Sequence, residues 1–333
     1  MKNNNTIPKP INEPIKAYAP GSPEKTSLKN CIQDLKSKTI EVPLIIGGEE
    51  IKSNNLSEMY VPHDHQHVLG NYHKAGLKEV NMAIEASLEA WKNWSKTSIE
   101  ERAKIFLKAA DLLAGPWRDT VNAATMLNMS KNVYQAEIDA ACELIDFFRF
   151  NAWYAQDLTE HQPMYSPEGM KNSLELRPLE GFVFAVSPFN FASIGGNLPC
   201  APAMMGNVAL WKPASSAVYP AYFIMQLLIE AGLPKGVINF IPGSGRDVGP
   251  NVMSNSNLAG VHFTGSTNVF QGMWKAIGEN IANYKSYPRI VGETGGKDFC
   301  IAHESADIDA LSTAMVRGAF EYQGQKCSAM SRA

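Results

Sequence analysis

The chain has 333 residues, with 30 basic and 33 acidic side chains, a formal net charge of -3, and 45% hydrophobic residues. This balance is typical of an ordinary globular protein and argues against nucleic-acid binding. No run of about twenty apolar residues occurs, so we expect no membrane-spanning helix. At this length two lobes are the default expectation, because single cores seldom grow much beyond about 250 to 300 residues.

The cysteines indicate a reducing compartment. They are odd in number and never spaced as Cys-x-x-Cys: Cys31, Cys142, Cys200, Cys300 and Cys327. We therefore expect neither a disulfide framework nor a zinc site. The first residues lack the apolar core of a secretory signal, and no arginine precedes Arg102, which argues against a mitochondrial presequence. We predict a bacterial cytoplasmic location, with the mitochondrial matrix as the alternative for a eukaryotic host.

The amino-terminal part begins with an arm. Residues 1–40 are rich in Asn, Pro and Lys, which predicts an extended segment over the surface. Residues 43–51 form two apolar runs around a Gly-Gly turn, as in a hairpin. Three alternating histidines, His63, His65 and His67, resemble a metal site, but such spacing in an extended loop is typical of a solvated turn. We therefore predict no bound metal.

Helical periodicity follows from Leu77. A second helix starts at Ser98, with Glu101 completing a capping box, and stops at Gly115. A third runs from about residue 132 through 152 and is apolar around most of its circumference, so we expect it to be buried or shared with a partner chain. Glu143 lies beside that packed face, and a solvent-exposed carboxylate is its simpler interpretation. Residues 157–178 then break the pattern as a hairpin or linker.

From residue 179 short apolar runs alternate with helical patterns, which predicts a doubly wound parallel α/β domain. We expect strands at 182–186, 208–211, 237–241 and 261–263, and helices at 191–206, 216–231 and 267–283. The domains are then an arm (1–40), a helical and strand part (41–156), the excursion (157–178), a Rossmann-like core (179–292) and the start of a second α/β domain (293–333). In that last part we expect a strand at 298–302 and a helix at 307–322.

Polar groups follow the predicted strands, at the edge where such sheets bind ligands. The amide of Asn190 can donate to a developing oxyanion, although a turn or helix cap is the more common use of asparagine. Lys212 offers a cation for ribose or phosphate, or is merely solvated. Residues 243–249 are glycine-rich and open a helix as phosphate-binding loops do, without the strict G-x-G-x-x-G spacing. Residues 264–266 also offer amides and hydroxyls.

The last part of the chain holds a candidate nucleophile. Cys327 follows a glycine and a lysine at the end of a helical pattern, where a thiol can be exposed and its thiolate stabilised. Glu293 lies upstream among glycines that permit close approach of a ligand to the backbone. The strand and helix predicted between them could bring the two side chains together. A structural role is the usual interpretation for the other four cysteines.

Five motifs, in order, resemble the signatures of the NAD(P)-dependent aldehyde dehydrogenase superfamily. They are Pro188-Phe189-Asn190, Trp211-Lys212-Pro213, Phe263-Thr264-Gly265-Ser266, Glu293-Thr294-Gly295-Gly296-Lys297 and Gly324-Gln325-Lys326-Cys327. Residues 135–140, 143–152 and 187–198 are similar to the 1-pyrroline-5-carboxylate (L-glutamate γ-semialdehyde) dehydrogenase branch. The similarity extends from about Asn12 to the end. It implies the aldehyde dehydrogenase fold, incomplete at the carboxyl terminus.

The resemblance also implies a mechanism. Cys327 attacks the aldehyde, Asn190 and the Cys327 amide hold the oxyanion, hydride passes to NAD, and Glu293 activates the water that hydrolyses the thioester. The implied cofactor residues are Ser187, Pro188, Phe189, Lys212, Ser215, Gly243, Gly245, Gly249, Phe263, Thr264, Gly265 and Ser266. The implied substrate residues are Phe191, Lys326, Ser328 and Glu143. The substrate is an amino-acid semialdehyde, and the implied assembly is a homodimer or higher homo-oligomer.

Three departures from the family pattern stand out. Ser215 replaces a common acidic ribose ligand, which weakens the expected preference for NAD over NADP. Gln323 precedes Gly324 where the branch usually has a second glycine. The sequence stops at Ala333, whereas family members continue. The alternatives are therefore a nucleotide-binding fragment without turnover, or a dehydrogenase for another aldehyde. An acylating enzyme that uses coenzyme A is disfavoured, because it needs no hydrolytic base such as Glu293.

Overall fold

The computed structural model describes residues 7–333. Part of the predicted arm, residues 1–6, lies outside this range. The expectation of a fully extended arm was wrong, because α1 (Pro23–Lys36) is helical. Pro23 occupies the first turn, where its missing N–H costs nothing, and Ser22 Oγ caps the helix by accepting a hydrogen bond from the Lys25 amide.

Five short strands follow the arm. Strands β1 (Ile40–Val42), β4 (Leu56–Val61) and β5 (Asp64–His73) form a three-stranded sheet in the order β1-β5-β4 within residues 7–333. Strands β2 (Leu44–Ile46) and β3 (Glu49–Ile51) pair antiparallel, which confirms the predicted hairpin. The turn before β5 contains His63, whose Nδ1 lies 2.8 Å from Ser130 Oγ. In residues 7–333 no group of three or more His, Cys, Asp or Glu side chains could hold a metal ion.

A helical layer comes next. Helices α2 (Leu77–Trp94) and α3 (Ile99–Ala114) lie as predicted, the latter with the Ser98–Glu101 capping box. Helix α4 (Arg118–Met129) was not predicted, because buried polar residues interrupt its apolar face. The third predicted helix is three segments: α5 (Val133–Ala136), a π-helical segment η1 (Glu137–Cys142) and α6 (Glu143–Glu160). No helix within residues 7–333 is both long and apolar enough to cross a membrane.

The central sheet has seven strands within the described residues, in the order β10-β9-β6-β7-β8-β2-β3. Four of its strands were predicted and run parallel: β6 (Phe182–Val186), β7 (Val208–Lys212), β8 (Ile238–Phe240) and β9 (Leu258–Gly265). Their helices are α7 (Ala192–Met204), α8 (Val218–Ala231), α9 (Gly245–Met253) and α10 (Thr267–Glu279), with short 3₁₀ turns at Ser215–Ala217 and Ile281–Asn283. Helix α7 contacts β6, β7 and β9, and α2 contacts β2, β7 and β8. This confirms the doubly wound α/β core.

The strand predicted at 298–302 was wrong. The fifth parallel strand is instead β10 (Arg289–Thr294), which pairs with β9 along its whole length. Residues 298–302 make a single bridge, between Phe299 and Arg332, because no strand within residues 7–333 pairs with them along their length. Helix α11 (Ile308–Phe320) and a 3₁₀ turn (Glu321–Gly324) complete the chain, close to the predicted helix.

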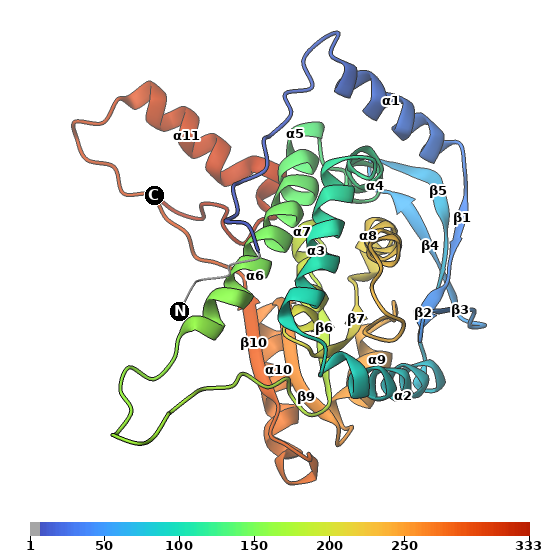
Figure 1. Cartoon of the computed structure of the whole chain (residues 1–333). Helices are drawn as coiled ribbons and strands as arrows, with labels where there is room; N and C mark the ends of the chain where they lie inside the picture. The colour runs from blue at the N-terminus through green and yellow to red at the C-terminus, as the bar shows by residue number, and fades with distance from the viewer. Residues whose placement is uncertain (1–6) are drawn as a thin grey trace.

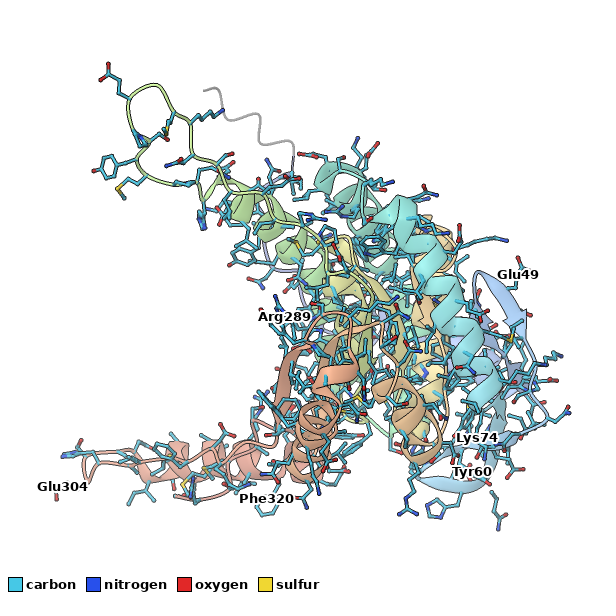
Figure 2. The ribbon with its side chains drawn as sticks, turned by 90° about the horizontal axis from the view of Figure 1, so that it is seen from below. Glu49, Tyr60, Lys74, Arg289, Glu304 and Phe320 are labelled. Carbon is cyan, nitrogen blue, oxygen red and sulfur yellow. The ribbon has the colours of Figure 1, made fainter. Side chains whose placement is uncertain are left out.

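Two segments project from the body. Residues after α6 form a long loop without regular structure, tied by Gln162, whose side chain bonds the backbone of Leu174 at both polar atoms. Helix α11 and its flanking loops extend away from the sheet (Figure 1). Seen from below, Glu304 lies at the far end of this second projection and Phe320 near the body (Figure 2). The chain therefore leaves the sheet after β10 and returns to it just before Cys327.

Candidate active site

The returning chain brings Cys327 to the end of β10. Glu293 is the fifth residue of that strand, in register with Thr264 of β9. Cys327 Sγ donates a hydrogen bond to Glu293 Oε1 at 3.5 Å. The structure thus brings together the sulfur and the carboxylate that the sequence paired, although a loop and α11 connect them and not a strand and a helix.

The expectation of a stabilised thiolate was wrong for this state of the site. Burial raises the pKa of the Cys327 thiol above its usual value, and the charge of Glu293 and the hydrogen bond to it raise that pKa further. The backbone amides of Ser328 and Cys327 act in the opposite direction without offsetting this. The thiol is therefore protonated at neutral pH, and Glu293 is in place to receive its proton.

Cys327 lies where two cavities meet. One cavity, of about 520 Å³, opens at the carboxyl ends of β6 and β9 and is lined by Pro188, Phe189, Asn190, Thr264, Gly265, Ser266, Lys326 and Cys327 among others. The second, of about 400 Å³, is lined by Glu143, Phe147, Phe191, Asn197, His262, Glu293, Cys327 and Ser328 among others. Thr264, Ile194 and Cys327 line both. A group bound in either cavity therefore has access to the sulfur.

Asn190 is turned toward the loop that carries Cys327. Its Nδ2 donates a hydrogen bond to the Gln325 carbonyl at 2.7 Å, and the residue lines the larger cavity together with Cys327. The amide group has a second N–H, and this is the donor that could serve an oxyanion.

Several residues predicted to bind the cofactor have side chains that already form hydrogen bonds or packing contacts within the protein. Ser187 is buried, and its Oγ donates to the Gly195 carbonyl at 3.1 Å and accepts from Trp211 Nε1 at 2.6 Å. The Phe263 ring is buried and stacked on Phe270, with ring centroids 5.5 Å apart. These side chains therefore pack within the protein, although Phe263 also lines the 400 Å³ cavity, and the assignment of both residues to the cofactor stays a prediction.

Lys212 lies beneath the glycine-rich loop. Its ammonium donates to the Pro213 carbonyl at 3.0 Å, and burial lowers its pKa to about 8. A Cβ on Gly245 would lie 3.8 Å from Lys212 Cε, whereas one on Gly249 would meet nothing. At Gly243 there is little space for a side chain, because a Cβ there would lie 3.0 Å from the Val248 side chain. The lysine and the start of α9 therefore face the same space.

Two further residues predicted to bind the cofactor, Ser266 and Ser215, line different cavities. Ser266 Oγ caps α10 by accepting from the Val269 amide at 3.4 Å, at the mouth of the 520 Å³ cavity. Ser215 lies in a third cavity, of about 600 Å³, together with Glu58, Tyr60 and His65 of the three-stranded sheet. The two serines line different cavities, and the assignment of each to the cofactor stays a prediction.

Comparison with known proteins shows the family of this chain. The model of the Aldehyde dehydrogenase family matches residues 50–333. The chain belongs to the aldehyde dehydrogenase family. It is 50% identical over 327 residues to the delta-1-pyrroline-5-carboxylate dehydrogenase of Agaricus bisporus, with 98% of this chain and 60% of that protein covered. It is 49% identical to the mitochondrial enzyme of that name from Dictyostelium discoideum, with 98% and 59% covered.

A solved structure agrees with this assignment. The delta-pyrroline-5-carboxylate dehydrogenase of Mycobacterium tuberculosis bound with NAD is 52% identical and superposes with a TM-score of 0.96, over 98% of this chain and 61% of that one. The fold is thus the α/β fold of the aldehyde dehydrogenases, in their 1-pyrroline-5-carboxylate dehydrogenase branch. The chain spans about 60% of the length of these relatives.

Three of the four predicted substrate residues of this family member line the 400 Å³ cavity: Phe191, Ser328 and Glu143. Glu143 is half-buried, and one of its oxygens accepts from Ser193 Oγ, so the interpretation as a solvated surface carboxylate was wrong. Burial raises the pKa of Glu143. Lys326 does not line this cavity, because its ammonium is bound by Asp139 at 2.9 Å and Glu321 at 3.3 Å.

His262 was missed by the sequence reasoning. It lies on β9, lines the 400 Å³ cavity, and its Nδ1 lies 2.9 Å from the Leu198 carbonyl, which fixes the ring. Burial lowers its pKa, so the imidazole is neutral at pH 7. Its position near the carboxyl end of a strand was the available signal, since the neighbouring Thr264 and Gly265 were singled out on that ground.

Proposed function

We propose that the chain carries the nucleophile, the base and the cofactor platform of an enzyme that oxidises L-glutamate γ-semialdehyde to L-glutamate with NAD, as in proline catabolism. One observation carries the proposal. Cys327 Sγ lies 3.5 Å from Glu293 Oε1 at the junction of two cavities, one at the carboxyl ends of the parallel strands. A nucleophile with an adjacent base and access to two sites is the arrangement that an aldehyde and a hydride acceptor require.

The residues at the strand ends fit a dinucleotide. The 520 Å³ cavity includes the start of α10, whose free amides favour an anionic group. Lys212 lies buried near the start of α9, where its ammonium donates a hydrogen bond to the Pro213 carbonyl. We propose that Lys212 and the starts of α9 and α10 would hold NAD, which accepts hydride when bound. NAD is preferred to NADP here because the Mycobacterium tuberculosis relative was solved with NAD.

The chemistry of this chain's own groups follows from the geometry. Glu293 takes the thiol proton, and the sulfur forms a bond to the aldehyde carbon while the carbonyl electrons move to oxygen. The second N–H of Asn190 and the Cys327 amide stabilise that oxyanion. Loss of hydride, which a bound NAD would accept, would restore the carbonyl as a thioester on Cys327. Glu293, having released its proton, then removes one from water, which attacks the thioester and frees the carboxylate product and the thiol.

The substrate is assigned on two grounds. The relatives at about 50% identity are named as delta-1-pyrroline-5-carboxylate dehydrogenases. In addition, Glu143 places a half-buried carboxylate in the 400 Å³ cavity, which Cys327 and Glu293 also line. Its pKa is raised by burial, so an ammonium group beside it would stabilise the ionised form. We therefore assign Glu143 to the α-amino group of the semialdehyde.

A second reading is a nucleotide-binding fragment without turnover. Large apolar side chains are exposed on β10, on α11 and on the loop between them: Val291, Ile301, Ile308, Val316 and Phe320. Exposed surface of this kind marks a face that another element covers in the folded enzyme. The chain also spans only about 60% of its relatives' length. On this reading Cys327 is present but its surroundings are incomplete.

One assay separates the two readings. The purified 333-residue chain is mixed with L-glutamate γ-semialdehyde and NAD, and NADH is followed by its absorbance, with Cys327→Ser as the control. NADH formed by the native chain and not by the variant supports the enzyme and rejects the fragment. NAD binding without turnover in both supports the fragment, and turnover by Cys327→Ser rejects the nucleophile assignment.

Assembly and location are further proposals. Exposed apolar side chains gather on the projecting loop after α6: Met164, Tyr165, Met170 and Leu174. We propose that this loop contacts a second copy in a homodimer or larger homo-oligomer, which analytical ultracentrifugation would detect. A cytoplasmic location remains the preferred prediction, and the Dictyostelium discoideum relative, named mitochondrial, supports the matrix as its alternative.

A further inference from the structure

The loop that carries Cys327 is attached to the body at a few points. Tyr322 donates from its hydroxyl to the Met129 carbonyl at 2.6 Å, the Gln325 carbonyl accepts from Asn190, and Lys326 binds Asp139. The rest of the projection lies away from the sheet, with Glu304 at its far end (Figure 2). After Cys327, Ser331 and Arg332 bind the backbone of residues 297 and 298, so Cys327 is connected to the body directly by the contacts in the few residues before it.

The backbone of this loop is in an unfavourable conformation. Tyr322, Gln323 and Gly324 have φ angles of 49°, 52° and 69°, all in the left-handed region. Only the last is a glycine, so two consecutive side-chain-bearing residues adopt a conformation that costs each of them about 1 to 2 kcal/mol. Side-chain contacts must hold the loop in this shape.

A buried lysine of the body, Lys131, contacts this loop and helps to stabilise its conformation. Lys131 is 3% exposed, and its ammonium lies 4.4 Å from the ring centroid of Phe191 and 4.6 Å from that of Tyr322. A cation between two aromatic faces is attracted to both. Phe191 lines the 400 Å³ cavity and Tyr322 belongs to the loop, so Lys131 joins the two.

One carboxylate oxygen binds both lysines. Asp139 Oδ2 lies 2.5 Å from Lys131 Nζ and 2.9 Å from Lys326 Nζ, and the Asp139 side chain is 3% exposed. Lys131 comes from the body, and Lys326 is bonded directly to Cys327 in the chain. Without Asp139 the buried ammonium of Lys131 and the partly buried ammonium of Lys326, which also binds Glu321 at 3.3 Å, would face each other and repel.

We propose that Asp139 is the positioning residue for Cys327: its carboxylate, shared between Lys131 and Lys326, holds the 322–327 loop so that the sulfur stays beside Glu293 and between the two cavities. The significance for catalysis rests on the proposed function, whereas the geometric claim does not. Asp139 lines neither cavity. It acts on Cys327 through Lys326 and, by way of Lys131, through Tyr322.

The π-helical segment offers a matched control. Glu137 and Asp139 both lie on Glu137–Cys142, both are buried, and both bind a cation. Glu137 pairs with Arg118 and the amino-terminal arm and makes no hydrogen bond or ion pair with residues 322–327. Glu137→Gln therefore reports the general effect of weakening a buried ion pair on this segment. Lys326→Met removes the ion pair with Asp139 from the loop side, and Lys326→Arg keeps the positive charge at this position.

The readout is the position of Cys327, which needs no turnover. Each folded variant is alkylated with iodoacetamide across a pH series, and modification of Cys327 is quantified by peptide mass spectrometry. The groups that face the thiol are Glu293 on β10, His262 on β9, Glu143 on α6, and Lys297 and Lys326 in the loops. Of these, Glu293 raises the pKa of the thiol, so release from Glu293 speeds alkylation.

We expect Asp139→Asn and Lys326→Met to raise the alkylation rate at neutral pH by about three-fold or more and to move the profile to lower pH. Glu137→Gln and Lys326→Arg should keep the native rate and profile. Native profiles in both Asp139→Asn and Lys326→Met overturn the proposal, as does an equal change in Glu137→Gln. If Asp139→Asn does not fold, the contrast between Lys326→Met and Lys326→Arg decides alone. A chain without aldehyde oxidation still gives this result, so the two proposals fail separately.

Discussion

Glu293 accepts a hydrogen bond from the Cys327 thiol, with 3.5 Å between Oε1 and Sγ. The pair therefore starts as a protonated thiol beside a carboxylate and not as a thiolate beside a cation. The same carboxylate can receive the thiol proton and later take one from water, so one residue serves both halves of the proposed reaction. The glycines around it leave the strand end open to a ligand.

Glu293→Gln should lower the pKa of the Cys327 thiol. Burial is the largest cause of the raised pKa, and the Glu293 charge is the next, so removing the charge shifts the pKa down without restoring its usual value. Because the variant lowers the pKa, thiolate forms at lower pH, and iodoacetamide should modify Cys327 faster at a given pH below that pKa. The measurement is the pH profile of alkylation, with Glu143→Gln as the control that removes a more distant cavity carboxylate.

The same Glu293→Gln variant has a second expected effect in the proposed reaction. Without the carboxylate, water is not activated, and the thioester on Cys327 should accumulate and appear as added mass in intact-protein spectra. A general base typically contributes about 10² to 10⁴ in rate. An unchanged steady-state rate in an active preparation would count against Glu293 as the base.

NAD binding should weaken as the pH rises through about 8, because burial lowers the pKa of Lys212 to about 8 and the ammonium is then lost. For a lysine the charged form is the low-pH form, so binding is strongest below this pKa. Lys212→Met should remove this pH dependence and cost about 1.5 to 3 kcal/mol of binding free energy at neutral pH. Calorimetric titration of the native chain and the variant with NAD checks both. Equal affinity of the two proteins at every pH would exclude Lys212 from the site.

The strand ends were predictable because local pattern is enough to place them. Short apolar runs followed by Asn190, Lys212, Gly243 and Ser266 identify the edge of a parallel sheet without any knowledge of distant contacts. What the pattern could not show is which of these side chains are already occupied. Ser187 resembles a cavity residue in sequence, yet its hydroxyl is bound by Gly195 and Trp211.

Long-range pairs account for the other errors. The resemblance assigns Lys326 to the substrate, and this stays a prediction, but no pattern in the sequence could show that its ammonium binds Asp139 on a helical segment far away in sequence. Helix α4 was missed because Asn122, Thr125 and Asn128 are buried polar residues that interrupt its apolar period. Asn122 is satisfied there by Tyr18 and Glu137, which come from the arm and the π-helical segment. Periodicity contains no information about such partners.

Arg118→Met should destabilise the fold by about 3 to 5 kcal/mol, because it leaves buried carboxylates unpaired. Arg118 is 1% exposed and binds both Glu137 and Glu13, the latter at 2.6 Å, and so joins α4 to the amino-terminal arm. The double variant Arg118→Met with Glu137→Met should recover much of the loss, since it removes the largest uncompensated charge. Denaturant unfolding of the three proteins measures this, and equal losses in the single and double variants would contradict it.

The same ion pair predicts acid sensitivity. Burial raises the pKa of Glu137, but hydrogen bonds from Arg118, Lys16 and Tyr18 outweigh it and hold that pKa below the usual 4.5. A depressed carboxyl pKa contributes stability that is complete above the unfolded value and is lost as the pH falls through the folded value. The native chain should therefore lose stability below about pH 4.5. In the double variant this part of the acid dependence should be missing from the pH series of unfolding midpoints.

Gln323→Gly should be more stable than Gln323→Ala by about 1 kcal/mol, because φ of 52° places this residue in the left-handed region. Both variants remove the glutamine side chain and its contact with Gln325, so their difference isolates the backbone conformation. Glycine also gains freedom in the unfolded chain, which keeps the expected difference below the full left-handed penalty of about 1 to 2 kcal/mol. Guanidinium unfolding compares the two, and hydrogen exchange of the 322–325 amides tests whether the gain lies in the loop. If alanine proved equal to glycine here, the loop before Cys327 would not be strained, and the contacts of Lys131 and Asp139 would have no strain to oppose.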